Sequence, residues 1–114
     1  MKPIYTEERP WGRFEQFTLN EKSTVKLLHV KPHSKLSLQY HSKREESWRV
    51  ISGSGKVVIG EKTLDVKEGD EFFIPIKEKH RIITEASSLV ILEIAHGEFD
   101  ENDIVRLEDA YNRK

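Results

Sequence analysis

The 114-residue sequence contains no cysteine, which excludes a disulfide framework, a thiolate metal site and a cysteine nucleophile. It also has no apolar run near the roughly 20 residues that span a bilayer. Its N-terminal stretch, MKPIYTEERPWG, carries charges and prolines in place of the apolar segment of a signal peptide. We therefore expect a cytoplasmic protein without a membrane partner.

An excess of charge of either sign is missing as well, since 19 Lys and Arg residues stand against 20 Asp and Glu residues. Domains that bind nucleic acids usually carry a basic excess, so we expect no nucleic-acid partner. The length suffices for one hydrophobic core, and we predict a single domain over residues 1–114.

What the sequence does contain is a series of short apolar segments separated by turn residues. Short strands with evenly spaced turns are typical of an all-β sandwich or barrel. Ser52–Gly55 is one predicted turn, and Gly60 is expected to take a positive φ in a tight hairpin. The predicted strands are Arg13–Leu19, Thr24–Val30, Leu36–Tyr40, Ser47–Ser52, Lys56–Ile59, Thr63–Val66, Glu71–Pro75, Arg81–Thr84 and Leu89–Ala95.

The C-terminal residues follow a different periodicity. Asp100 could cap a helix, with Asp103 placing negative charge in its first turn. Ile104, Leu107 and Tyr111 are spaced by three and four residues and would share one helical face. We predict a short C-terminal helix that packs on the sheet.

A polar cluster interrupts the strand pattern where a small core should be packing. Side chains two residues apart share a strand face, so Gln39 and His41 point the same way. If the sheet closes into a barrel, these two could meet Glu46 and His80 at its mouth. Two imidazole nitrogens, a carboxylate and an amide oxygen suit a divalent ion such as Zn, Co, Ni, Mn or Fe. A solvated polar surface is the alternative for the same residues.

Two motifs carry a resemblance to known proteins. HSKLSLQYHSKREESWRVISG, from His33 to Gly53, and GDEFFIPIKEKH, from Gly69 to His80, resemble the paired motifs of the cupin superfamily. RPWG near the start, LSLQYH, REESW, IPIKEKHR and the closing DIVRLEDAY resemble the type II mannose-6-phosphate isomerase domain. These blocks run from Arg9 to Tyr111 in the same order as in that domain.

The resemblance implies a cupin double-stranded β-helix, or jelly roll, and commonly a homodimer. It places the metal ligands on Gln39, His41, Glu46 and His80, and it implies a small phosphorylated sugar as the partner. Such a domain usually follows a mannose-1-phosphate guanylyltransferase domain in one long chain. Because 114 residues leave no room for that domain, we expect no guanylyltransferase activity.

The sequence departs from the family pattern around the pocket. His33 and Lys77 stand where glycines are expected, and Ser42, Lys43 and Ser47 stand where relatives often have histidines. None of these changes removes a predicted ligand. They alter the rim of the pocket, and they leave open which sugar is bound and whether the domain is active.

The reaction that the resemblance implies interconverts mannose 6-phosphate and fructose 6-phosphate through an enediolate. It requires a base, a cation that stabilises developing negative charge, and a cationic patch for the phosphate. We predict Arg44 as a catalytic cation, and Lys26 and Lys35 as substrate-binding cations. Glu93 lies in the apolar run LVILEIA, where we expect it to be buried with a raised pKa, and it is the candidate base. The alternatives are a structural ion pair for Glu93 and a metal-bound hydroxide as the base. Trp48 is predicted to stack on the sugar, with core packing as its alternative.

Two other functions fit the same residues. One is a non-catalytic, metal-containing cupin that binds a sugar or another small ligand. The other is a metal-dependent oxygenase, because one fold hosts many chemistries. A cationic patch beside the metal favours the isomerase over the oxygenase, since an apolar substrate would not need it.

Overall fold

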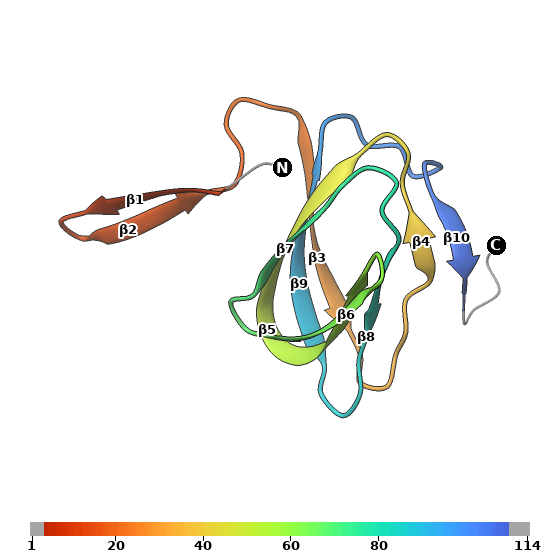
Figure 1. The fold of residues 1–114 in the computed structure, drawn as a ribbon. Coiled ribbons are helices and arrows are strands. Elements are labelled where there is room, and N and C mark those ends of the chain that lie inside the picture. Colours follow the sequence, from red (N-terminus) through yellow and green to blue (C-terminus); the bar gives the residue numbers. More distant parts are fainter. Residues whose placement is uncertain (1–3, 110–114) are drawn as a thin grey trace.

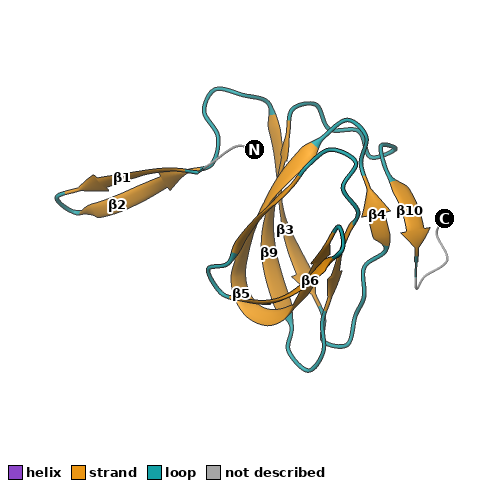
Figure 2. Ribbon diagram, in the orientation of Figure 1, coloured by secondary structure: helices purple, strands orange, loops and turns teal. Residues whose placement is uncertain are grey.

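The computed structural model describes residues 4–109, which form ten β-strands and no helix (Figures 1 and 2). None of these residues belongs to a helix long and apolar enough to cross a membrane. The strands are β1 Tyr5–Arg9, β2 Gly12–Gln16, β3 Ser23–Val30, β4 Leu38–Tyr40, β5 Glu45–Ile59, β6 Lys62–Lys67, β7 Glu71–Ile74, β8 His80–Ile83, β9 Leu89–His96 and β10 Val105–Glu108.

The long strand β5 joins the two halves of the barrel (Figure 1). Its first half pairs with β7 and β9, and its second half pairs with β6 and β8. Strand β3 extends one sheet beyond β9, and β4 and β10 extend the other beyond β8. This arrangement confirms the all-β jelly roll that was predicted from the sequence.

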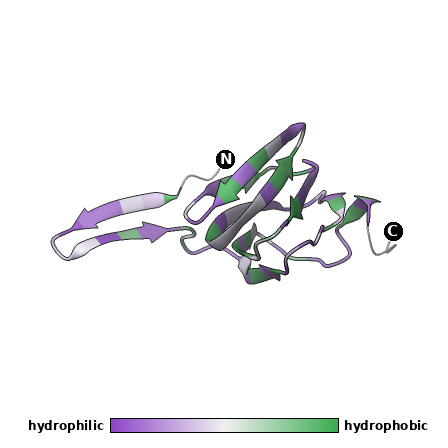
Figure 3. Cartoon of the chain, turned by 90° about the horizontal axis from the view of Figure 1, so that it is seen from below, coloured by the Kyte–Doolittle hydropathy of each residue, from purple (hydrophilic) through white to green (hydrophobic). Residues whose placement is uncertain are grey.

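Polar and apolar residues alternate along the barrel strands, as Figure 3 shows. In the first half of β5, the side chains of Glu46, Trp48 and Val50 are buried, and the residues between them are partly exposed. Side chains with period two share one face of a strand, so this face lines the interior. The hydrophobic core takes residues from both sheets: Val30, Trp48, Val50, Val57, Val66, Ile74, Ile82, Leu89 and Ile91.

The predicted turn at Ser52–Gly55 is wrong, because β5 continues through these residues. Its glycines serve close packing instead of chain reversal. A Cβ atom at Gly53, which has φ +86°, would lie 2.0 Å from the carbonyl oxygen of Ser88. A Cβ atom at Gly55 would lie 2.8 Å from the carbonyl oxygen of Ile83. The strand can pass this close to its neighbours only because both positions lack a side chain.

Of the hairpins β5–β6 and β1–β2, the sequence predicted only the first. The hairpin between β5 and β6 is confirmed, with Gly60 at φ +61° and Ile59 paired with Lys62. The hairpin β1–β2 forms a separate two-stranded sheet that extends away from the barrel (Figure 1). Its β1 strand, YTEER, has no apolar alternation and was not predicted. Arg49 of β5 holds it through two hydrogen bonds to the Glu15 carboxylate, at 2.5 and 2.9 Å.

The predicted C-terminal helix over 100–111 is also wrong for the described residues. A turn is followed by strand β10, which pairs antiparallel with β4. The carboxylate of Asp103 accepts hydrogen bonds from the backbone N–H groups of Ser42 and Lys43, instead of capping a helix. Pairing satisfies the open edge of β4, so tertiary contact overrides the helical periodicity. Tyr111, the last residue of the predicted helix, lies outside the described residues.

The two positions where the family pattern expects glycine keep a left-handed backbone. His33 has φ 54° and Lys77 has φ 68°. The backbone N–H of Lys77 donates to the carbonyl oxygen of His41 at 2.7 Å, which fixes the loop between β7 and β8 against the end of β4. A non-glycine residue in this region is strained by about 1–2 kcal/mol.

We expect Lys77→Gly to raise the free energy of unfolding by about 0.5–1 kcal/mol, because relief of this strain outweighs the greater backbone entropy that glycine loses on folding. Urea denaturation measures the change. Lys79→Gly, in the same loop but not at positive φ, is the matched control and should lower stability. Equal effects of the two variants would contradict the expectation.

Candidate metal centre

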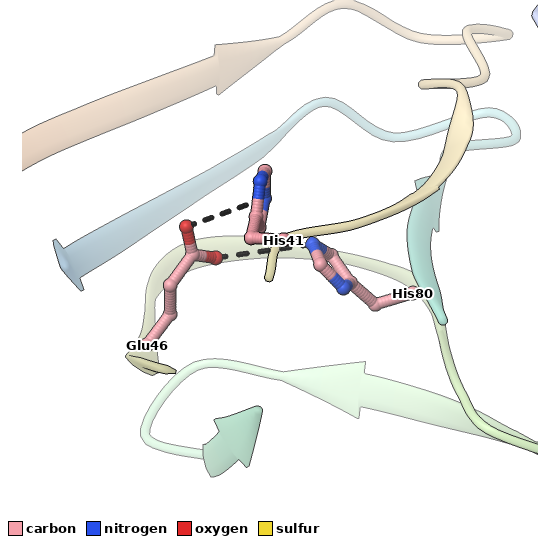
Figure 4. Close-up of side chains that lie close together, drawn as sticks. All are labelled: His41, Glu46 and His80. Atoms are coloured by element: carbon pink, nitrogen blue, oxygen red, sulfur yellow. Dashed lines mark ion pairs between the residues drawn. The ribbon is translucent and has the colours of Figure 1, made fainter. Parts of the chain in front are cut away.

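Three predicted ligands converge at one end of the barrel (Figure 4). His41 follows β4, Glu46 lies in β5 and His80 begins β8. All three side chains are at most 3% exposed. The Nε2 atom of His41 lies 3.6 Å from Oε2 of Glu46, and the Nε2 atom of His80 lies 3.9 Å from Oε1. The carboxylate therefore faces both imidazoles.

Hydrogen bonds fix both imidazole rings in the same tautomer. The Nδ1 atom of His41 donates to the carbonyl oxygen of Asp103 at 2.7 Å, and Nδ1 of His80 donates to that of Glu78 at 2.9 Å. Because a carbonyl oxygen only accepts, each Nδ1 carries a proton, and in a neutral ring Nε2 then carries the lone pair and faces the cluster. Burial lowers the pKa of His80, so its ring stays neutral, as a metal ligand must be.

The cluster fits a divalent ion. One potential ligand atom from each of the three residues lies within 4.8 Å of the others. Among residues 4–109, the Nε2 atom of His80 is buried without a hydrogen-bond partner, which is costly unless a ligand completes it. Two imidazoles and a carboxylate could hold Zn, Co, Ni, Mn or Fe, as the sequence predicted.

Gln39 lies next to the cluster, because it pairs with His80 across β4 and β8. Residues that are directly opposite in an antiparallel pair share one face, so the side chain of Gln39 is on the His80 side of the sheet. Its Oε1 atom accepts a hydrogen bond from the hydroxyl of Ser37 at 2.7 Å. Its role as a fourth ligand stays a prediction.

Arg44 contacts two of the ligands directly. Its Nε donates to Oε2 of Glu46 at 3.0 Å, and its NH2 group lies 3.3 Å from Nε2 of His41. Its NH1 group donates to the carbonyl oxygen of Asp100 at 3.2 Å. The guanidinium is only 7% exposed, so a buried positive charge neutralises the buried carboxylate.

Trp48 holds the other oxygen of the same carboxylate. Its indole N–H donates to Oε1 of Glu46 at 3.1 Å, and its ring meets that of His80 edge-on, with centroids 5.4 Å apart. The side chain is 3% exposed and belongs to the hydrophobic core. Trp48 therefore orients Glu46, and sugar stacking by this residue stays a prediction.

Glu93 and Lys26 form a second polar pair on the inner face. They are directly opposite across β9 and β3, and Trp48 is opposite Glu93 on β5. Glu93 is 8% exposed, and burial, with a smaller contribution from the negative charge of Glu46, raises its pKa to about 7. The positive charges of Lys26 and Arg44 oppose this rise. Glu93 is thus a carboxyl group that can gain or lose a proton near neutral pH.

Two basic residues lie outside this arrangement. Lys35 is exposed and forms an isolated β-bridge with Ile83. Ile83 is the last residue of β8, whereas His80 is the first. The contact of Lys35 with substrate stays a prediction. Arg81 follows His80 in β8 and donates from Nε to the carbonyl oxygen of Leu36 at 3.0 Å. A second contact joins it to Glu108 of β10, so it braces strands around the site.

Sequence reasoning missed two residues that shape the site. Asp103 holds the ring of His41 through its carbonyl oxygen, although it was read as part of a helix. Phe99 lies against the cations Lys26 and Arg44. Neither residue carries a local signal, because both reach the site through the fold of the connection between β9 and β10.

The jelly roll and its inward-facing cluster define the protein as a cupin. More narrowly, the chain belongs to the family described as "Mannose-6-phosphate isomerase C-terminal", whose model matches residues 3–109. Among solved structures, a cupin protein from Bacteroides fragilis has a TM-score of 0.62 at 21% identity, covering 75% of this chain and 76% of that chain. At this identity the likeness supports the fold alone.

Two curated relatives have similar sequences. The chain is 39% identical over 107 residues to the alginate biosynthesis protein AlgA of Pseudomonas aeruginosa, and 38% identical over 107 residues to the xanthan biosynthesis protein XanB of Xanthomonas campestris pv. campestris. Each match covers 92% of this chain but only 22% of AlgA and 23% of XanB. The chain therefore spans less than a quarter of the length of these relatives.

The raised pKa of Glu93 predicts a pH-dependent stability. The pKa of Glu93 is about 7 in the folded protein and near 4.5 in the unfolded chain. Between these two pH values, only the folded protein keeps the proton on this carboxyl group. The resulting stabilisation is complete below about pH 4.5 and is lost as the pH rises through about 7. In metal-free protein, Glu93→Gln should therefore gain about 1–3 kcal/mol relative to wild type between pH 5 and pH 8. Urea denaturation at each pH measures the difference.

An exposed carboxylate supplies the control for this pH series. Glu61→Gln should show a constant difference from wild type across the same range, since its side chain is 91% exposed. A constant difference for Glu93→Gln as well would show that Glu93 has no raised pKa.

Because Nε2 of His80 lacks a hydrogen-bond partner among the described residues, we predict that a bound metal ion stabilises the folded protein. Saturating Zn²⁺ or Co²⁺ should raise the melting temperature of wild type by roughly 5 °C or more, because the ion binds only the folded chain. His80→Ala should lose this increase. His29→Ala, which removes an exposed imidazole from β3, should keep it. An equal increase in both variants would place the bound ion elsewhere.

Proposed function

We propose that the protein is a metal-dependent sugar-phosphate isomerase that interconverts mannose 6-phosphate and fructose 6-phosphate through an enediolate. The observation that carries this proposal is the buried cluster of His41, Glu46 and His80, with a carboxyl group of raised pKa and two cations on the same inner surface. Membership of a mannose-6-phosphate isomerase family supports a sugar phosphate as the ligand.

His41, Glu46 and His80, with Gln39 as the proposed fourth ligand, would hold the divalent ion. When bound, such an ion supplies a Lewis acid for the negative charge that develops on the substrate oxygens at C1 and C2. Trp48 and Arg44 keep the Glu46 carboxylate in one orientation, since each donates to a different oxygen. Arg44 also places a positive charge beside the reacting oxygens, which would lower the energy of the enediolate.

Glu93 is the proposed base that carries the proton between C1 and C2. A base works best when its pKa lies near the working pH, because it must both accept and return the proton. Burial gives Glu93 this property by raising its pKa to about 7. Lys26, directly opposite on β3, favours the ionised form and keeps the carboxylate available.

Lys26 and Arg44 are the proposed anion subsite. Lys26 comes from β3 and Arg44 precedes β5, yet both lie against the same ring, that of Phe99. Two cations that converge in a partly buried site fit a phosphate dianion, and they fix the sugar relative to the metal. Lys35 and Trp48 are the other proposed substrate contacts. Lys35 is exposed, and the indole N–H of Trp48 donates to Glu46.

A second candidate function is a non-catalytic cupin that binds a sugar or another small ligand. The contacts of Arg44 favour it, because a guanidinium already occupies positions beside Nε2 of His41 and Oε2 of Glu46. A site neutralised by its own side chain could bind ligand without turning it over. Turnover separates the two functions.

We further propose that residues 1–114 form one cupin domain that acts in the cytoplasm and, from the family resemblance, that this domain forms a homodimer. The partner would be a small phosphorylated sugar. Neither a nucleic acid nor a membrane enters this proposal.

Metal-loaded protein should convert mannose 6-phosphate to fructose 6-phosphate. The product is measured by coupling its formation to the reduction of a nicotinamide cofactor. Lys26→Met should raise KM about tenfold or more with a smaller change in kcat, because it removes a charge-assisted contact to the phosphate. The control is Lys56→Met, whose ammonium pairs with Asp65 at 3.1 Å on the outer surface. Its kinetics should match wild type.

Two results would contradict different parts of this proposal. An unchanged KM in Lys26→Met would remove Lys26 from the anion subsite. Tight binding of mannose 6-phosphate without turnover, whichever common divalent ion is loaded, would leave the non-catalytic cupin as the function.

A further inference from the structure

Phe99 lies in the connection between β9 and β10, and its ring is shared by the two cations of the proposed anion subsite. The ammonium nitrogen of Lys26 and the guanidinium carbon of Arg44 each lie 4.4 Å from the centroid of this ring. The other two cation–ring contacts among residues 4–109 are longer and involve one cation each. Two positive charges therefore converge on one neutral side chain.

Lys26 depends on this ring for its contacts. Within the described part of the chain, its ammonium group makes no hydrogen bond or ion pair, although the residue is half-buried on the inner strand face. Glu93 lies directly opposite on β9, but among residues 4–109 its carboxyl group makes no hydrogen bond or ion pair with this ammonium group. The positive charge of Lys26 is thus left facing an aromatic ring where an anion would bind more strongly.

The segment that carries Phe99 is anchored at both ends. The N–H of Gly97, which has φ +87°, donates to the carbonyl oxygen of Lys22 at 2.8 Å. At the other end, Asp103 accepts hydrogen bonds from the N–H groups of Ser42 and Lys43. Between these anchors, the carbonyl oxygen of Asp100 accepts a hydrogen bond from NH1 of Arg44 at 3.2 Å, so displacement of the ring would be a rotation of the Phe99 side chain on a held backbone.

We propose that Phe99 is a specificity-determining residue: its ring occupies the anion subsite between Lys26 and Arg44 in the free protein, and an anionic ligand group displaces it. This inference rests on the proposed function, which assigns those two cations to the phosphate. A contact between a cation and a ring is worth about 0.5–2 kcal/mol. A phosphate dianion that meets both cations gains more than this, whereas a neutral group gains too little to displace the ring. Phe99 therefore makes access conditional on a phosphorylated ligand.

The test measures binding of inorganic phosphate to the full chain by titration calorimetry, in metal-free and Zn²⁺-loaded forms. Phe99→Ala should bind phosphate about tenfold more tightly than wild type in both forms, since the free protein no longer loses two cation–ring contacts on binding. A purely structural role for the ring would weaken binding instead. Phe99→Leu, which keeps apolar bulk but removes the π face, should also bind more tightly, and it decides the result if Phe99→Ala does not fold.

A matched control is available on the hairpin β1–β2. Phe14 also contacts a cation, with the guanidinium carbon of Arg9 at 5.3 Å from the centroid of its ring, but it lies in β2, in the hairpin that extends away from the barrel (Figure 1). Phe14→Ala should leave phosphate binding unchanged. In a Lys26→Met background, the gain from Phe99→Ala should shrink, because one of the two contacts is already absent.

The outcomes separate this inference from the function on which it rests. If Lys26→Met weakens phosphate binding and Phe99→Ala strengthens it, both hold. If Lys26→Met weakens binding but Phe99→Ala and Phe99→Leu bind no more tightly than wild type, the displacement of Phe99 is overturned and the anion subsite stands. If Lys26→Met binds phosphate as wild type does, the subsite and the inference fall together.

Discussion

The buried carboxylate of Glu46 is the constraint around which the site is built. A carboxylate that is 1% exposed is stable only if both oxygens have partners and its charge is balanced. Trp48 donates to one oxygen and Arg44 donates to the other, and the guanidinium of Arg44 balances the charge. A divalent ion would complete the same balance, because it would meet the lone pairs that the two rings turn inward. The polarity of this end of the barrel thus follows from one buried negative charge.

Strand β5 brings these groups together. Its first residues place Glu46 and Trp48 on the inner face, opposite Ala95 and Glu93 of β9, and its second half pairs with β8, which begins at His80. One continuous strand therefore fixes the ligands from both sheets relative to each other. Glycine within the strand makes this continuity possible, since a side chain at Gly53 would collide with the backbone of Ser88. Precise placement of a site on rigid strands is what binding of a small ligand requires.

The positive charges of the site serve two neighbouring purposes. Arg44 contacts the ligand cluster and also the ring of Phe99, so it belongs both to the metal centre and to the proposed anion subsite. Lys26 belongs to the anion subsite and favours ionisation of Glu93. The connection between β9 and β10 links the two tasks, because Phe99 covers the cations while Asp103 orients His41. This coupling suits a ligand with a phosphate at one end and a reacting carbon skeleton at the other.

Strand and turn patterns in the sequence predicted an all-β sandwich or barrel. The resemblance to cupin and isomerase motifs predicted the jelly roll and the ligands His41, Glu46 and His80, which the structure brings together. The sequence also predicted that Glu93 would be buried with a raised pKa. Only the tertiary structure decided that residues 105–108 form a strand, since the open edge of β4 competes with helical periodicity, and that Ser52–Gly55 continue a strand instead of turning. It likewise decided that Arg44 donates to Glu46 and that Phe99 contacts both Lys26 and Arg44. Such contacts join residues far apart in the chain, and their energies depend on burial and on neighbours that no local pattern encodes.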